Sequence, residues 1–382
     1  MQVGIHRFYS NEINKPKYLT SKAKFTNLWK LDNGIWKLSR VFSYDHKEQI
    51  PDTLNESLIF KDEQTTEKWL IKNHVPALGI GWIKEGKIQV TKVYGELEKG
   101  KEATDSTLFN VASLTKPITA LIALKLTNSG LWNLDEPLCK YWIDPDVVND
   151  PRALKLTSRH VLSHQTGFAN WRHNNIDGKL SFEFEPGSYY QYSGEGFEYL
   201  RKALEMKFNK SLDQLADELV FKPLKMENTH FYWDSTIDES RFAKWHRADG
   251  TIYKTYKNNS ANAADDLITT IEDYCKFMVH IMDSAGLSEE LYTQMISPQA
   301  RVKPNKYFGL GWMVDENIGN GEIAINHGGD DKGVHTIAFI LPNSKQGLVL
   351  FTNCDNGIDI YIQSILYYLG ELGQGIINVE TK

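Results

Sequence analysis

Residues 110–126 read NVASLTKPITALIALKL, and this segment places a serine and a lysine at the start of a strongly apolar run. From Ile118 to Leu126 the residues leave almost no polar face, and a helix that is apolar on every side is a buried helix. Gly130 follows as a C-terminal stop signal. Ser113 and Lys116 are three residues apart, so a helix brings their side chains to one face.

This pairing has the chemistry of a nucleophile and its base. Backbone N–H groups and the positive end of the helix dipole stabilise an oxyanion near Ser113. Burial disfavours the charged form of Lys116, so that its amine can accept the serine proton. The spacing alone decides little, because Ser21 and Lys24 show it in a polar setting that reads as surface. A helix-capping serine beside a solvated lysine stays open as the alternative for Ser113.

The composition is that of a soluble globular protein. The chain has 382 residues, of which 41% are hydrophobic and 24% are charged, with a net charge of −6. This is not basic enough to indicate nucleic-acid binding. No apolar run is long enough to span a membrane, and the first ten residues lack the apolar core of a signal peptide. Without a CxxC spacing, Cys139, Cys275 and Cys354 are expected to be free, mostly structural thiols.

Outward from residues 110–126, the sequence predicts an α/β (α+β) fold. A helix is expected at 62–73, followed by two strands joined by a tight turn at Glu85 and Gly86. Three strand signals return late, before a C-terminal helix. These elements predict one mainly antiparallel sheet flanked by the N- and C-terminal helices. The late strand signals are GEIAINH (321–327), VHTIAFILP (334–342) and GLVLFTN (347–353), and the final helix signal is DIYIQSILYYLGEL (359–372).

The predicted domain organisation has two lobes and an extension. Residues 61–118 and 262–382 form an α/β lobe, and residues 119–261 form a large helical insertion with punctuated loops. The cleft between the lobes is the expected active site. Residues 1–60 are an N-terminal extension of unknown role, in which 14–24 reads as loop and 34–45 as at most a short strand.

Several stretches together resemble one known family. LFNVASLTKPITALIALKL is similar to the first active-site motif of the serine β-lactamase and penicillin-binding-protein-like hydrolases, in the branch with class C β-lactamases, D-alanyl-D-alanine carboxypeptidases and family VIII esterases. Other segments agree in order and spacing across roughly residues 61–370. They are LDEPLCKYW (134–142), KLTSRHVLSHQTGF (155–168), EPGSYYQYSGEGFEYL (185–200), FKPLKMENTHF (221–231), YFGLGWMV (307–314) and the segment 325–353 that begins INHGGDDKG.

The resemblance implies a role for each motif residue. Ser113 would be the acylated nucleophile, Lys116 its proton partner and Tyr192 the phenol that passes the proton to the leaving group. His327 takes the third-motif position, where it would hold the proton network and an anionic or carbonyl group of the substrate. The backbone N–H groups of Ser113 and Asp330 would form the oxyanion hole, where the loss of one donor costs about 3 kcal/mol. No metal or cofactor is expected.

Two positions depart from the family pattern. Gly194 replaces the Asn that usually follows the tyrosine by two residues, and Gly328 replaces the hydroxyl residue of the third motif. In β-lactam-specific members these groups bind the substrate amide and carboxylate, so we expect poor recognition of β-lactams. Gly328 and Gly329 would leave the strand edge open to substrate. Trp171 is either a wall of the substrate pocket or ordinary packing.

The resemblance leaves several functions open. The first is a serine hydrolase of esters, small amides or D-amino-acid peptides. The alternatives are a peptidoglycan D,D-carboxypeptidase or β-lactamase, and a non-catalytic ligand-binding relative. The expected partner is a small molecule or short peptide, with no nucleic acid and no membrane span. The oligomeric state is open, and a periplasmic or secreted location follows only if the N-terminus was trimmed.

Other chemistry is less favoured. His160 and His164 have a zinc-compatible spacing but no Glu between them, and we interpret them as structural. Asp330 and Asp331 are interpreted as a polar turn rather than a cation site. No Gly-x-Ser-x-Gly elbow occurs, which argues against an α/β-hydrolase fold.

Overall fold

The computed structural model describes residues 2–9, 19–32, 34–48 and 59–381. The chain divides into two compact units, Met1–Asp62 and Glu63–Lys382, and each is described by itself. Among the described residues, no helix combines the length and the apolar character that crossing a membrane requires.

The first unit is a three-stranded antiparallel sheet of β1 (Gln2–Tyr9), β2 (Leu19–Asp32) and β3 (Ile35–Glu48). The prediction of a loop at 14–24 is wrong for residues 19–24, which belong to β2, and 14–18 lie outside the described residues. The prediction of at most a short strand at 34–45 is also wrong, because β3 has 14 residues. The pairing places Lys30 opposite Lys37. The same ladder pairs Trp29 with Leu38, so polar and apolar pairs are mixed along these strands and the alternation that indicates a strand is weak.

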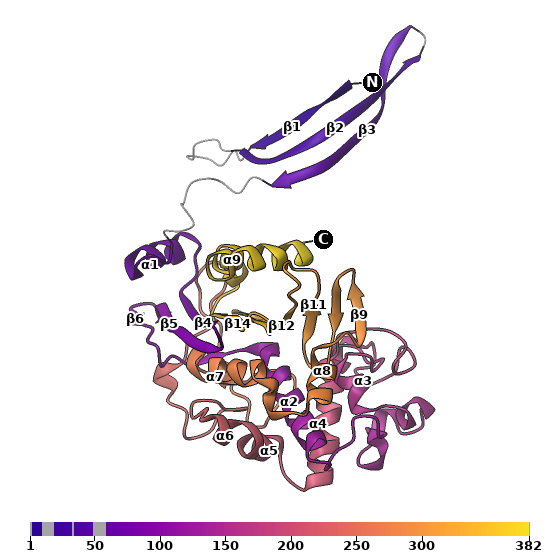
Figure 1. Ribbon diagram of the computed structural model, residues 1–382, viewed down its shortest axis with the longest axis vertical. Coiled ribbons are helices and arrows are strands. Elements are labelled where there is room, and N and C mark those ends of the chain that lie inside the picture. Colours follow the sequence, from indigo (N-terminus) through magenta and orange to yellow (C-terminus); the bar gives the residue numbers. More distant parts are fainter. Residues whose placement is uncertain (1, 10–18, 33, 49–58, 382) are drawn as a thin grey trace. The chain divides into compact units, whose positions relative to one another are not determined.

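The second unit contains a nine-stranded sheet in which every neighbouring pair is antiparallel, as predicted (Figure 1). The strand order is β6-β5-β4-β14-β13-β12-β11-β10-β9. The turn between β4 and β5 has positive φ at Glu85 and Gly86, as a tight hairpin requires. The strands are β4 (Ala77–Lys84), β5 (Lys87–Glu98), β6 (Lys101–Glu102), β9 (Ala300–Lys303), β10 (Lys306–Phe308), β11 (Met313–Asp315), β12 (Ala324–Asp331), β13 (Val334–Leu341) and β14 (Gln346–Thr352).

Helices cover both faces of this sheet. Figure 1 shows α9 (Tyr361–Glu380) on one face and α7 (Ile271–Met282) on the other. The central strand β14 is therefore buried at six consecutive positions, from Gly347 to Thr352. The predicted N-terminal helix is present as α1 (Glu63–Lys72), and α8 (Glu289–Ile296) follows α7. The mixed fold with flanking helices, predicted from the sequence, is confirmed.

The remaining helices gather in the middle of the chain. Residues 119–261 are all described, and they contain helices, loops and isolated bridges but no strand. The short strands β7 (Phe109–Asn110) and β8 (Ile268–Thr269) pair just outside this span. The helices are α2 (Thr115–Asn128), α3 (Ser158–Leu162), α4 (Gly194–Phe208), α5 (Leu212–Ala216) and α6 (Lys222–Leu224).

The predicted buried helix is α2. Every residue from Thr115 to Leu124 is buried, including Lys116. Ser113 lies just before α2, in a 3₁₀ turn at Ala112–Leu114 that leads into the helix. The core of the second unit surrounds this helix, so that the turn and its serine are held from several sides.

Candidate active site

The turn that carries Ser113 is fixed by hydrogen bonds on both sides. Ala112 has a φ of 46°, a left-handed conformation that costs energy for a residue with a Cβ atom. Thr115 Oγ1 donates to Ala112 O at 2.7 Å and accepts from Leu267 N at 3.0 Å. Tyr274 Oη donates to Leu114 O at 3.0 Å. The surrounding core therefore holds a strained turn in the one orientation that presents Ser113.

Lys116 reaches Ser113 as the spacing predicts. Its Nζ atom lies 2.9 Å from Ser113 Oγ and donates to Ala264 O at 2.8 Å. The side chain is only 1% exposed. Burial lowers the pKa of Lys116 to about 7, although the nearby Asp265 carboxylate acts in the opposite direction. A large fraction of this amine is therefore neutral near pH 7 and able to accept a proton from Ser113.

Tyr192 completes a compact group with these two residues. Its ring centre lies 4.7 Å from Lys116 Nζ and stacks on the His164 ring at 4.2 Å. Burial raises the pKa of the Tyr192 phenol well above its usual range, while its hydrogen bond with Ser113 acts in the opposite direction. Tyr192 is consequently a neutral proton donor at ordinary pH, whereas Lys116 is the group suited to be the base.

His160 and His164, which have a zinc-compatible spacing, form hydrogen bonds within the protein instead. His164 Nδ1 accepts from Ser193 N at 3.0 Å, and His164 O accepts from Gln191 N at 2.8 Å. His164 thereby holds the loop that carries Tyr192. His160 forms a capping box with Thr157 at the start of α3. No cluster of three or more metal-ligating side chains occurs among the residues that the structure describes.

His327 lies on β12 beside this group, with its ring centre 6.1 Å from that of Tyr192. Its Nδ1 atom is 2.7 Å from Gly328 O, which requires the proton on Nδ1 and leaves a lone pair on Nε2. Burial and the charge of Lys116 lower the pKa of His327 to about 3. In the described structure Nε2 is buried and has no hydrogen-bond partner. His327 therefore offers a neutral acceptor, which is unsuited to binding a carboxylate.

The edge of β12 approaches the nucleophile turn closely. β11 pairs only with Ala324–Asn326, so beyond Asn326 this edge of β12 has no strand neighbour in the described sheet. A Cβ atom on Gly329 would lie 2.4 Å from Val111 O and 3.2 Å from Ser113 N. Only glycine allows this approach. It brings the backbone of Gly329, which directly precedes Asp330, next to the N–H of Ser113.

The two departures from the family pattern have different physical origins. A Cβ atom on Gly194 would lie 2.7 Å from the Trp171 ring, and Gly194 N donates to Asn170 Oδ1 at 2.9 Å. Trp171 thus packs where a side chain at position 194 would lie, which favours the packing interpretation of this residue. A Cβ atom on Gly328 would meet only Thr336 O, at 3.8 Å. The absence of a hydroxyl there is therefore not imposed by sterics.

Sequence reasoning missed Asp265 and Asp266, which directly follow the carbonyl that binds Lys116. Their signal in the sequence is a pair of adjacent carboxylates, ADDL at 264–267, with no helical or strand pattern around it. Nothing in that pattern indicates proximity to Ser113, because 148 residues separate Lys116 from Ala264. The proximity arises only from the fold.

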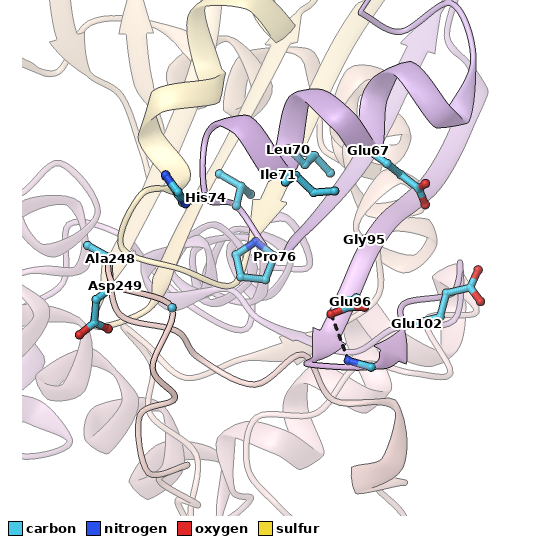
Figure 2. A pocket seen from close by; sticks show the side chains of 13 residues that line it. Glu67, Leu70, Ile71, His74, Pro76, Gly95, Glu96, Glu102, Ala248 and Asp249 are labelled. Atoms are coloured by element: carbon cyan, nitrogen blue, oxygen red, sulfur yellow. Dashed lines mark hydrogen bonds between the residues drawn. The ribbon is translucent and has the colours of Figure 1, made fainter. Parts of the chain in front are cut away.

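A separate cavity of about 680 Å³ lies between α1, the β5–β6 hairpin and the loop 248–250 (Figure 2). None of the predicted site residues lines it. Its wall contains four acidic side chains, of which Glu96 accepts a hydrogen bond from Gly100 N at 3.1 Å. The four are Glu67, Glu96, Glu102 and Asp249. The cavity is therefore separate from the group formed by Ser113, Lys116 and Tyr192.

Known proteins resemble this chain in sequence and in fold. The sequence model of the family described as Beta-lactamase matches residues 57–363. Protein flp of Staphylococcus aureus (strain MW2) is 22% identical over 316 residues, covering 75% of this chain and 61% of the relative. The chain thus spans less than two thirds of that curated relative.

Two solved structures have the same fold at 20% sequence identity. The octameric penicillin-binding protein homologue from Pyrococcus abyssi has a TM-score of 0.69, covering 82% of this chain and 77% of that one. The D-amino acid amidase from Ochrobactrum anthropi SV3, complexed with D-phenylalanine, has a TM-score of 0.67, covering 84% and 99%.

Proposed function

This chain belongs to the Beta-lactamase family, and from that premise we propose that it is a serine hydrolase that works through an acyl-Ser113 intermediate. The observation that carries the proposal is the 2.9 Å contact between Ser113 Oγ and the buried Nζ of Lys116. A serine at a strained turn, beside a lysine with a lowered pKa, is an activated nucleophile.

Acylation begins when Lys116 takes the proton of Ser113 and Oγ attacks the substrate carbonyl. The negative charge that develops on the carbonyl oxygen is stabilised by the N–H groups of Ser113 and Asp330. Tyr192 then donates its proton to the leaving group, and Lys116 returns the serine proton to Tyr192. Each proton transfer occurs within the Ser113–Lys116–Tyr192 group, so no external acid is needed.

Deacylation uses the same groups in reverse. A water molecule that gives its proton to the Tyr192–Lys116 pair attacks the acyl carbonyl, and Ser113 leaves with a proton from Lys116. His327 contributes a hydrogen-bond acceptor, because its neutral Nε2 has a free lone pair in the described structure. By accepting a hydrogen bond, His327 would orient an N–H or O–H group of the substrate or of the attacking water.

The proposed substrates are esters or small amides rather than β-lactams or D-alanyl-D-alanine peptides, which carry a carboxylate. Position 194 lacks the family's amide side chain, and the Trp171 ring fills the space that such a side chain would occupy. His327 is neutral, so it supplies no positive charge for the antibiotic carboxylate. An unpaired polar group of the substrate costs about 1–3 kcal/mol. The structural similarity to a D-amino acid amidase favours the D-configured amide among these candidates.

A matched substrate panel tests this assignment. Purified full-length protein is assayed with short-chain nitrophenyl esters, D-alanine p-nitroanilide, nitrocefin and D-alanyl-D-alanine peptides. We expect ester or D-amide turnover with kcat/KM at least tenfold above that for nitrocefin and the dipeptide. Preferential turnover of nitrocefin or the dipeptide would contradict the substrate assignment, and binding without any turnover would favour a non-catalytic relative.

The pH dependence follows from Lys116. The base must be neutral, and burial lowers its pKa to about 7. We therefore expect kcat/KM to fall as pH decreases through about 7, because the amine becomes protonated. The profile is measured on a neutral ester between pH 5 and 9, with the spontaneous rate subtracted. A rate that is constant from pH 5.5 to 8 would contradict Lys116 as the base.

A further inference from the structure

Two carboxylates lie next to the catalytic lysine and have no role in the steps above. Asp265 follows Ala264, whose carbonyl oxygen accepts from Lys116 Nζ at 2.8 Å. Asp265 Oδ1 accepts from Asp266 N at 2.9 Å, and Asp266 Oδ1 accepts from Asn110 Nδ2 at 3.3 Å. Asp266 has a φ of 71°, so the backbone is strained where it presents this pair.

The charged neighbours of these carboxylates are mostly other carboxylates. Burial raises the pKa values of Asp265 and Asp266, and the carboxylate of Asp331, at the end of β12, raises both further. None of the three forms an ion pair within the described part of the chain. Lys116 is the cation that acts on Asp265, and the proposed reaction requires Lys116 to be neutral. A half-buried carboxylate without a countercharge is costly.

A second observation at the same site points to a ligand. His327 is 1% exposed, and its Nε2 lone pair has no partner in the described structure. With Nδ1 turned to Gly328 O, Nε2 points away from that carbonyl, and the ring lies beside Tyr192. Around Lys116 the described structure thus has one acceptor without a donor, His327 Nε2, and two carboxylates without an ion-pair partner. A ligand that satisfies them brings N–H donors and positive charge.

We propose that Asp265 and Asp266 bind an ammonium group of the substrate, so that the preferred substrates are esters or amides carrying a free amine. This inference rests on the proposed acyl-Ser113 hydrolysis and names the substrate class. A bound ammonium replaces Lys116 as the countercharge of Asp265. The attraction of the Asp265 carboxylate, which favours the protonated form of Lys116, is then weakened. A larger fraction of the Lys116 amine is therefore neutral and able to accept the serine proton. Anionic substrates meet repulsion from the same carboxylates.

The test compares substrates that differ only in the ammonium group. One pair is D-alanine p-nitroanilide and isobutyric p-nitroanilide, in which a methyl group replaces the amine. The other is 4-(aminomethyl)phenyl acetate and 4-ethylphenyl acetate, which moves the amine to the leaving group. The ratio of kcat/KM within each pair cancels any effect of a variant on the basal chemistry. We expect the full-length protein to prefer the charged member of at least one pair by about tenfold or more.

The variants Asp265→Asn and Asp266→Asn keep the shape and the local hydrogen bonds but remove the charge. Each is expected to reduce that preference about tenfold, while Glu102→Gln, which removes an exposed charge beside the separate cavity, leaves it unchanged. Equal turnover of charged and neutral members, or a preference unaffected by both variants, overturns the inference but leaves the hydrolase proposal intact. Failure to hydrolyse any of the four compounds, or the esters of the panel, overturns the hydrolase proposal itself.

Discussion

Replacing Ser113 by alanine is expected to reduce hydrolysis of any accepted substrate by at least about 10³-fold, close to the uncatalysed rate. The alanine removes the hydroxyl oxygen that lies 2.9 Å from Lys116 Nζ and that would form the acyl intermediate. The fold should survive, because the turn is held by Thr115 and Tyr274 rather than by the serine side chain. Initial rates and thermal unfolding are measured on the same preparation.

Ser21 provides the matched control for that variant. It is the other serine that has a lysine three residues later, and it lies on the strand β2 of the first unit. Ser21→Ala should leave kcat/KM within about twofold of the unmodified protein. Comparable losses in both variants would show that the effect comes from general damage. Full activity in Ser113→Ala would remove the proposed nucleophile.

Gly329→Ala is expected to lower kcat by about 10²–10³-fold, the range seen when one oxyanion donor is lost. The new methyl group would lie 2.3 Å from Thr336 Oγ1 and 2.4 Å from Val111 O, and one of these contacts is with backbone. β12 must therefore move away from the turn that carries Ser113, and the two proposed N–H donors separate. The change is measured as kcat at saturating substrate, where weakened binding has no influence.

Gly328, the neighbouring glycine, shows whether the loss of activity comes from a steric clash or from any glycine-to-alanine change on β12. A methyl group on Gly328 meets only one atom, Thr336 O at 3.8 Å, which is an ordinary contact. Gly328→Ala should therefore keep kcat within a few-fold of the original value. Equal activity in the two variants would contradict the placement of the oxyanion hole between β12 and Ser113 N. Unfolding measurements on both variants distinguish a local shift from global destabilisation.

The second unit was largely predictable because its signals are local. The β4–β5 hairpin, the late strands and the two flanking helices all show apolar periodicity bounded by turn residues. The first unit was not predictable in the same way. Its long strands mix polar pairs such as Lys30 and Lys37 with apolar pairs such as Trp29 and Leu38, so no regular alternation marks them. A pattern of hydrophobicity cannot register that kind of strand.

The candidate site was also predictable only in part. Ser113, Lys116, Tyr192 and His327 could be predicted because each lies in a motif with fixed spacing, although their proposed roles stay predictions. Asp265 could not, because its closeness to Lys116 depends on how the end of the helical segment returns to α2. The steric reason for Gly194 also needed the structure, since Trp171 is 23 residues away in sequence. Long-range contacts of single side chains leave no periodic trace in a sequence.

The central claim is that Ser113 becomes acylated, and peptide mass mapping after reaction with a fluorophosphonate probe tests it most directly. The protein is incubated with the probe at pH 8, digested and analysed for the modified peptide. We predict that the added mass is located on Ser113 and that Lys116→Met prevents the labelling. Labelling on another residue, or an unmodified Ser113 in protein that hydrolyses its substrate, would contradict this account.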